Sequence, residues 1–164
     1  MSVLSKAQIG RCGELLVQYR LLQLGIESSP MTTDSGIDLV VYSPKLARAQ
    51  TVQVKANHRP KPSGGKGQLA LDWWLREDSP AELVALVDLS LDRVWLFRHA
   101  EVTELAQQRS NGSVHLYFYV DADYQPRSPG THINEFARFE LRNRIEEIFG
   151  IKPLSMAEAE EPLS

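Results

Sequence analysis

Three polar side chains interrupt two short apolar runs of this sequence. Asp38 opens a run rich in valine, and Gln53 and Lys55 alternate with valines in the run 51–56. A carboxylate and neighbouring amide or backbone oxygens can hold Mg²⁺, and an ammonium group beside them can orient the water that attacks a phosphodiester. An ordinary ion pair between Asp38 and Lys55 is the competing structural interpretation.

Both runs predict β-strands, over 37–42 and 51–56, joined by a short hairpin loop. Side chains alternate along a strand, so Gln53 and Lys55 share one face and the intervening valines share the other. One hairpin register places Asp38 opposite Lys55, and a register shifted by two places it opposite Gln53. Either register gathers the three polar groups on one face, which we expect a helix to cover.

A helix is expected before these strands, because apolar residues recur at steps of three and four over 5–24. Gly25 stands where this helix would end. The expected apolar stripe consists of Ile9, Cys12, Leu16 and Tyr19, widened by Leu15 and Leu22. Glu14 is an acid inside the helix, and Gly13 before it would let another backbone come close. Glu14 is therefore a candidate second acid of the site.

The order Glu14, then Gly36-x-Asp38-Leu39, then Gln53-Val54-Lys55 resembles the signature of the PD-(D/E)XK nuclease superfamily. The pattern is close to that of archaeal Holliday junction resolvases and of group I intron homing endonucleases that use Gln-x-Lys. The resemblance covers residues 5–90 and implies a restriction-endonuclease-like core. In that core, a helix carries the acid and a hairpin carries the aspartate and the lysine, followed by a helix and a further strand.

The resemblance implies a role for each matched residue. Asp38 would be the principal ligand of Mg²⁺ or Mn²⁺, and the Gln53 amide and the Val54 carbonyl would complete the shell. Glu14 would bind the metal through water or orient it. Lys55 would position the attacking water and stabilise the charge that builds on the phosphorus oxygens.

Two positions depart from the family pattern. Ile37 stands where proline is common, and Gln53 replaces the usual glutamate. A neutral amide oxygen is a weaker Mg²⁺ ligand than a carboxylate. The sequence thus predicts a metal-dependent DNA endonuclease. It leaves open a non-catalytic nucleic-acid-binding module on a nuclease fold, and a protein interaction domain in which Asp38 and Lys55 form only an ion pair.

Positive charge is concentrated in the same part of the chain. The stretch 39–71 contains six basic residues and no acidic one. Arg59, Lys61 and Lys66 lie within 58–67, where prolines and glycines predict a flexible surface loop. Phosphates of DNA are the expected partners of these three cations.

The rest of the chain predicts a mixture of strands and helices. Strands are expected at 26–33, 83–89, 93–97 and 114–120, and helices at 101–109 and 134–149. For the adjacent Trp73 and Trp74, we expect one ring in the core. The predicted class is α/β (α+β), with a central mixed sheet flanked by helices.

Length and composition limit the remaining possibilities. The chain has 164 residues, 43% of them hydrophobic, and a formal net charge of −3. We expect one nuclease domain over 1–154 and an acidic tail over 155–164. No apolar run is long enough to span a membrane and no signal peptide is recognisable, so a cytoplasmic protein without a membrane partner is expected. A chain of this size reaches one scissile phosphate, so double-strand cutting predicts a homodimer.

Overall fold

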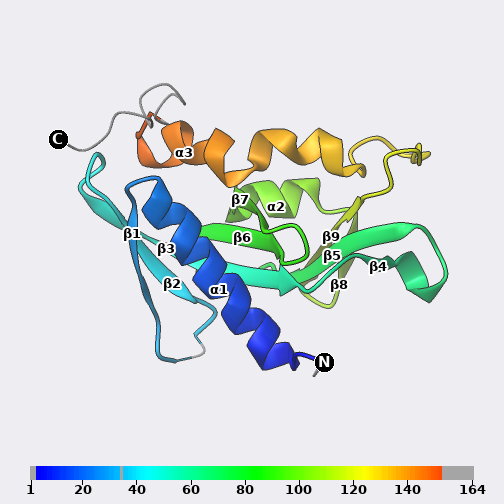
Figure 1. Ribbon diagram of the computed structural model, residues 1–164, viewed down its shortest axis with the longest axis horizontal. Coiled ribbons are helices and arrows are strands. Elements are labelled where there is room, and N and C mark those ends of the chain that lie inside the picture. The colour runs from blue at the N-terminus through cyan, green and yellow to red at the C-terminus, as the bar shows by residue number, and fades with distance from the viewer. Residues whose placement is uncertain (1–2, 34, 153–164) are drawn as a thin grey trace.

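Two β-sheets organise the chain (Figure 1). The computed structural model describes residues 3–33 and 35–152, so the predicted tail at 155–164 lies outside the described residues. The first sheet is mixed and has the strand order β1 (Glu27–Pro30), β2 (Leu39–Ser43), β3 (Arg48–Asn57), β6 (Leu83–Asp88), β7 (Arg93–Arg98). The second is antiparallel and has the order β4 (Lys61–Pro62), β5 (Leu69–Arg76), β9 (Ser113–Tyr119), β8 (Gln108–Ser110).

Helices cover these sheets, and α1 has a capping residue before its start and a glycine just after its end. They are α1 (Lys6–Gln23), α2 (His99–Leu105), α3 (Leu141–Phe149) and the 3₁₀ segments η1 (Ser63–Gly65) and η2 (Ile133–Phe139). Ser5 caps α1 by accepting a hydrogen bond from the Gln8 backbone N–H, and the Gln8 side chain accepts one from the Ser5 N–H in return. Gly25 has φ +76° just after α1, as the predicted helix end requires.

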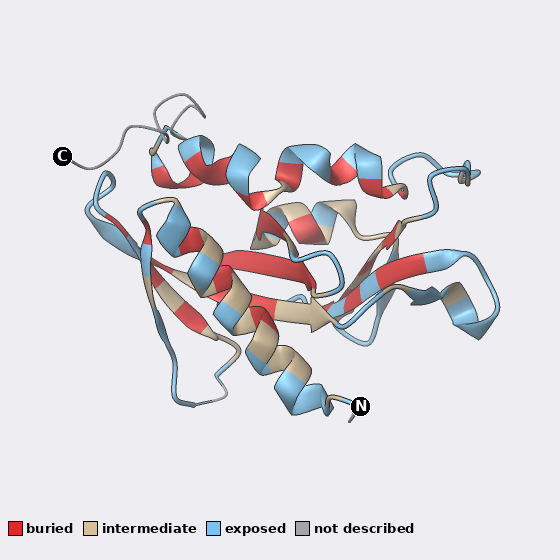
Figure 2. Cartoon of the chain, in the orientation of Figure 1, coloured by how far each residue is buried: buried red, intermediate tan, exposed pale blue. Residues whose placement is uncertain are grey.

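The first sheet separates two apolar cores. On one face, Val17 and Leu21 of α1 and Ile145 and Phe149 of α3 pack on the valines and leucines of the strands. On the other face, β6 and β7 pack against the second sheet, α2 and η2. β6 is buried along its whole length, as Figure 2 shows, because both cores use it.

The buried stripe of α1 differs from the predicted one. Gly13, Val17 and Leu21 are buried, whereas Leu15, Tyr19 and Leu22 are exposed, the last by 64%. The physical reason is a close approach at Gly13, where an added Cβ would lie 2.6 Å from the Cβ of Ala56. The helix is therefore turned so that its glycine, rather than a leucine, meets β3.

The connection from β3 to β6 also differs from the family core implied by the sequence. These two strands are parallel, so the chain must cross over between them. In the described residues this crossover contains β4, η1 and β5 rather than a full helix. The predicted irregular loop at 58–67 is wrong in part, because Lys61 and Pro62 pair with the start of β5.

The predicted helix at 134–149 is interrupted at Glu140. This residue has an extended backbone (φ −56°, ψ 138°) and bridges the backbone of Trp95 in β7, which separates η2 from α3. The inward positions were nevertheless predicted correctly, since Phe136, Phe139 and Ile145 are all buried. The predicted helix at 101–109 is shorter, because residues 108–110 form β8. Within the described residues, no helix has the length and apolar character needed to cross a bilayer.

Candidate metal and nucleic-acid site

The hairpin of β2 and β3 adopts the second of the two predicted registers. Leu39 pairs with Val52, so one further step places Asp38 opposite Gln53. Asp38 lies just before β2, and its backbone N–H donates to the Val52 carbonyl (2.9 Å). Its carbonyl accepts a hydrogen bond from the Met31 N–H (2.9 Å). Both backbone bonds fix the position from which the Asp38 side chain projects.

The Asp38 carboxylate turns toward the next residues of β3. Its Oδ2 accepts a hydrogen bond from the Val54 backbone N–H at 2.6 Å. A strand residue directs its N–H and its C=O toward the same neighbouring strand. Because β2 begins at Leu39, the Val54 carbonyl also faces the edge that Asp38 occupies. The Asp38 carboxylate thus lies against the Val54 backbone at this end of the β2–β3 ladder, on the side toward which the Val54 carbonyl is directed.

Gln53 is buried, with 7% of its surface exposed. Its Oε1 accepts a hydrogen bond from the Ser79 hydroxyl at 3.3 Å. Ser79 lies between β5 and β6 and had no signal in the sequence, because 26 residues separate it from Gln53. An amide oxygen has two lone pairs, so it can accept from Ser79 and still serve as a ligand.

Gln53 and Lys55 face the second core and not α1. They pair in parallel with Val84 and Leu86, whose side chains belong to that core. The prediction that a helix covers the polar face is therefore wrong. The helix packs on the opposite face of β3, where the core valines lie.

Glu14 nevertheless lies close to the strand residues. Its carboxylate forms an ion pair with Arg11 one turn earlier in α1 (2.7 Å), and 25% of the Glu14 side chain is exposed. The ion pair leaves one Glu14 oxygen outside that short contact. The absence of a Cβ at Gly13 brings this turn of α1 against β3.

A pocket of about 520 Å³ joins these elements, and we call it the Asp38 pocket. It is lined by Lys6, Ile9, Gly10, Glu14, Asp38, Gln53, Val54, Lys55, Ala56, Asn57, His58 and Lys61. All the residues predicted to hold metal or act in catalysis are in this set. Of the predicted DNA-binding residues, Lys61 lines the pocket, whereas Arg59 and Lys66 are exposed nearby in the chain.

Sequence reasoning missed Lys6 and Asn57 as members of the pocket. Lys6 had a signal, since it lies two steps of four residues before Glu14 and so shares its side of the helix. Asn57 ends β3 and follows Lys55 by two residues. Within the described residues, no group of three or more His, Cys, Asp or Glu side chains is placed to hold a metal. A metal in this pocket would need amide and backbone oxygens as well.

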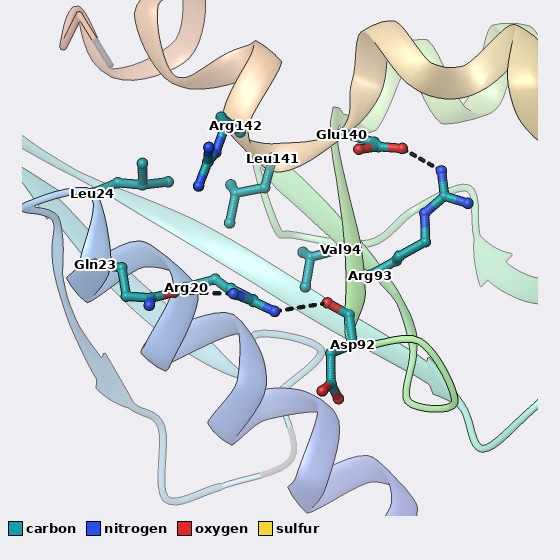
Figure 3. Close-up of a pocket in the computed structure, with 9 residues that line it drawn as sticks. All are labelled: Arg20, Gln23, Leu24, Asp92, Arg93, Val94, Glu140, Leu141 and Arg142. Carbon is teal, nitrogen blue, oxygen red and sulfur yellow. Dashed lines mark hydrogen bonds and ion pairs between the residues drawn. The ribbon is translucent and has the colours of Figure 1, made fainter. Parts of the chain in front are cut away.

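A second pocket lies at the other end of α1 (Figure 3). We call it the arginine pocket, and its lining consists of Arg20, Gln23, Leu24, Asp92, Arg93, Val94, Glu140, Leu141 and Arg142. Arg20 donates to the Gln23 side chain (3.2 Å) and to the Asp92 carbonyl (3.4 Å), and Arg93 pairs with Glu140. None of the predicted site residues is in this pocket.

Comparison with known proteins identifies the fold of this chain through its structure and not through its sequence. No known protein-family model matches the sequence, and no curated protein matches it. The structure is similar to the bacterial homing endonuclease I-Ssp6803I, with a TM-score of 0.52 and 18% identity over 77% of this chain and 85% of that one. It also matches Hjc, a Holliday junction resolvase of Archaeoglobus fulgidus, with a TM-score of 0.45 and 15% identity over 65% of this chain and 82% of that one. The similarity to the homing endonuclease confirms the predicted fold, a restriction-endonuclease-like mixed sheet flanked by helices.

Proposed function

We propose that this chain is a metal-dependent endonuclease that hydrolyses phosphodiester bonds of DNA in the Asp38 pocket. The observation that carries the proposal is the meeting of the Asp38 carboxylate with the Val54 backbone at the end of the β2–β3 ladder, in the pocket that Lys55 also lines. The nuclease-type fold, shared with a homing endonuclease, supports the same function.

The oxygen groups of the pocket suit a hard divalent cation. Mg²⁺ prefers carboxylate, carbonyl and water oxygens and keeps several of its waters. Asp38 and the Val54 carbonyl would hold the metal directly, with the Gln53 amide and Glu14 completing the shell, partly through water. When bound, the metal would stabilise negative charge on the phosphate and lower the pKa of a water molecule.

The side chains of the protein would perform the remaining tasks. The short bond from the Val54 N–H orients the Asp38 carboxylate before a metal arrives, so little ordering remains to be done at binding. Lys55 would orient the attacking water and stabilise the charge that builds on the phosphate oxygens. Arg11 pairs with Glu14 and limits its rotamers, which favours one position of that carboxylate.

The exposed cations next to the pocket would bind the DNA backbone. Lys61 lines the pocket, and Arg59 and Lys66 lie on the same segment between β3 and β5. Each phosphate contact releases counterions, so binding should weaken as salt rises. Cutting both strands of a duplex would require a second copy of the chain, which sedimentation of the protein with and without DNA would detect.

A non-catalytic nucleic-acid-binding module is the second candidate. The observation that favours it is the bond from Ser79 to the Gln53 amide, in the position where a carboxylate is usual in this fold family. A neutral amide already engaged by a hydroxyl contributes less to metal affinity than a carboxylate does. This candidate keeps the cations of the pocket and removes only the chemistry.

One set of assays separates the candidates. The full chain is incubated with duplex, nicked, branched and single-stranded DNA in Mg²⁺, Mn²⁺ or EDTA, together with the Asp38→Ala and Lys55→Ala variants. Metal-dependent cutting that both substitutions abolish is the result expected for the endonuclease. Salt-sensitive binding without cutting under any of these conditions would establish the binding module instead. A protein that neither cuts nor binds would contradict both.

A further inference from the structure

Aromatic side chains line the outer face of the second sheet. The inner face of β5 and β9 is buried, for example at Trp73 and Phe118, whereas their outer face carries Trp74, His115, Tyr117 and Tyr119. Adjacent rings are in contact, with centroids 4.4 Å apart for the first pair and 5.5 Å apart for the next two. The sequence had predicted one tryptophan in the core, and Trp73 is that residue.

Trp74 is the most exposed ring of this row, with 46% of its surface accessible. Its indole lies parallel to the His115 imidazole, with an angle of 1° between the planes. Asp72 and Gln108 each bond one nitrogen of His115, at 3.0 and 3.2 Å, and so hold the imidazole in place. One face of the indole is thus covered and fixed.

The other face of the Trp74 indole is directed away from β9. On that side β5 is paired only by β4, which reaches no further than Leu69 and Ala70. At residues 72–76 no described strand pairs with this edge of the sheet, and the Asp72 carbonyl there is bonded by the Asn57 side chain. An immobilised indole with one open face beside an open edge is suited to a flat ligand.

The aromatic face adjoins the Asp38 pocket. Lys61 lines that pocket, and it pairs with Ala70, which in turn pairs with Tyr119 of the aromatic row. Asn57, also of the pocket, donates from its side-chain amide to the Asp72 carbonyl at 2.7 Å. A strand of nucleic acid whose phosphate lies in the pocket could therefore continue over this face.

We propose that the aromatic face binds unpaired nucleotides beside the scissile phosphate, with one base stacked on Trp74. The inference rests on the proposed endonuclease function and adds a substrate class, DNA with a single-stranded segment next to the cut. Aromatic side chains stack on any base, whereas the bases of an intact duplex are already stacked on one another. The face therefore favours flaps, gaps or junctions over blunt duplex.

The polar atoms of the face fit this ligand better than a second protein subunit. The row ends in two tyrosine hydroxyls and includes the Asp72–His115 pair, whereas the centre of a subunit interface is depleted in charge. Burial raises the pKa of the Tyr117 hydroxyl above its usual value, with neighbouring tyrosines adding to the shift. The hydroxyl therefore stays protonated and can donate to a phosphate.

The test uses the intrinsic fluorescence of the full chain, titrated in EDTA with a single-stranded oligothymidylate and, separately, with a blunt duplex. Trp73 and Trp95 are buried, so a change on binding reports on Trp74. We expect quenching by the single strand in the wild type. The Trp74 variants lack this reporter, so their affinities are compared with that of the wild type through the fluorescence anisotropy of a dye-labelled oligothymidylate. Binding should be about tenfold weaker in Trp74→Ala, and most of the affinity should be recovered in Trp74→Phe. Tyr19→Ala, which removes an even more exposed aromatic ring from α1, should bind as the wild type does.

Two results would overturn the inference. One is equal single-strand binding by the wild type and by Trp74→Ala. The other is a wild-type dimer in sedimentation that Trp74→Ala dissociates without changing single-strand binding, which would make the face a subunit contact. Cleavage is measured separately from binding. Trp74-dependent binding without any cutting would refute the endonuclease and keep the aromatic site, whereas Asp38-dependent cutting without a Trp74 effect would do the reverse.

Discussion

The Asp38 pocket and the arginine pocket lie at opposite ends of α1, and each is lined by three basic and two acidic side chains. In the arginine pocket, Arg20 and Arg93 bind groups of their own chain and connect α1 to β7 and β7 to the start of α3 (Figure 3). In the Asp38 pocket, the aspartate accepts a hydrogen bond from the backbone of β3 just before β2 begins. The two pockets thus have the same numbers of charged side chains but use them differently. Paired guanidinium groups join elements, whereas a carboxylate at a strand end, beside a backbone carbonyl, is suited to a metal.

The largest expected effect comes from removing one cation from each pocket. Lys55→Met should lower the rate of DNA cleavage by about 10²–10³-fold, because in the proposed mechanism it removes the group that stabilises charge in the transition state. Arg142→Met, the matched loss of a cation in the arginine pocket, should leave the rate unchanged. Single-turnover cleavage of one DNA substrate measures both. Equal losses in the two variants would mean that only overall charge matters and would remove the distinction between the pockets.

A second pair of variants tests how closely α1 must approach β3. Gly13→Ala should lower the free energy of unfolding by about 1–3 kcal/mol, because its Cβ would lie 2.6 Å from that of Ala56. A Cβ added at Gly10 would have no neighbour within 4 Å, so Gly10→Ala should raise the free energy of unfolding by about 1 kcal/mol through helix propensity. Urea denaturation measures both. The double variant Gly13→Ala/Ala56→Gly should recover most of the loss, and a failure to do so would contradict the close approach.

The sequence predicted where β2 and β3 lie and which of their residues share a face, but it did not predict the register in which the two strands pair. Valine alternation located β2 and β3 and placed Gln53 with Lys55. Because a shift of two residues keeps every side chain on its face, the pattern could not decide whether Asp38 lies opposite Lys55 or Gln53. The structure selects Gln53. Glu14, Asp38, Gln53 and Lys55 were grouped from the sequence because their order follows a known motif, and the structure places all four on the lining of one pocket.

Tertiary packing decided the features that the sequence did not reveal. On α1, Leu15 and Tyr19 continue an apolar period, but the tight contact at Gly13 turns that stripe outward. The alternating run 114–120 was predicted correctly as a strand, yet nothing local shows that it pairs with β5 in a second sheet. Ser79 reaches Gln53 only through this long-range folding. The local sequence pattern predicts helices and strands, whereas the partner of each strand or side chain depends on contacts between residues far apart in the sequence.

A glutamate at position 53, which is the usual residue in the family pattern, tests whether the Asp38 pocket is the one that binds metal. Gln53→Glu should increase the affinity for Mg²⁺ about tenfold, because a carboxylate is the better ligand. Without metal the same variant should be less stable than the wild type, since the new charge is buried beside Asp38. Thermal unfolding with increasing Mg²⁺ measures both effects. A variant whose Tm does not respond more strongly to Mg²⁺ than that of the wild type would argue against Gln53 as part of the metal shell.

The smallest effect is expected in the arginine pocket. Arg93→Ala breaks an ion pair with Glu140 and a cation–π contact with Trp95 (4.8 Å to the ring centroid), at a site about one third exposed. Exposed pairs of this kind contribute little, so the loss of stability should be about 1 kcal/mol or less. Cleavage should not change. Loss of activity with unchanged stability would assign the arginine pocket a part in catalysis that our interpretation denies it.

Metal binding itself tests the central claim most directly. Calorimetric titration of the full chain with Mn²⁺ is compared for the wild type, Asp38→Asn and Asp92→Asn. The last is a matched control, because Asp92 lines the arginine pocket and its backbone has a positive φ that asparagine also adopts readily. We predict one site in the wild type, retained in Asp92→Asn and lost in Asp38→Asn. Unaltered binding in Asp38→Asn, or no binding by the wild type, would contradict the account.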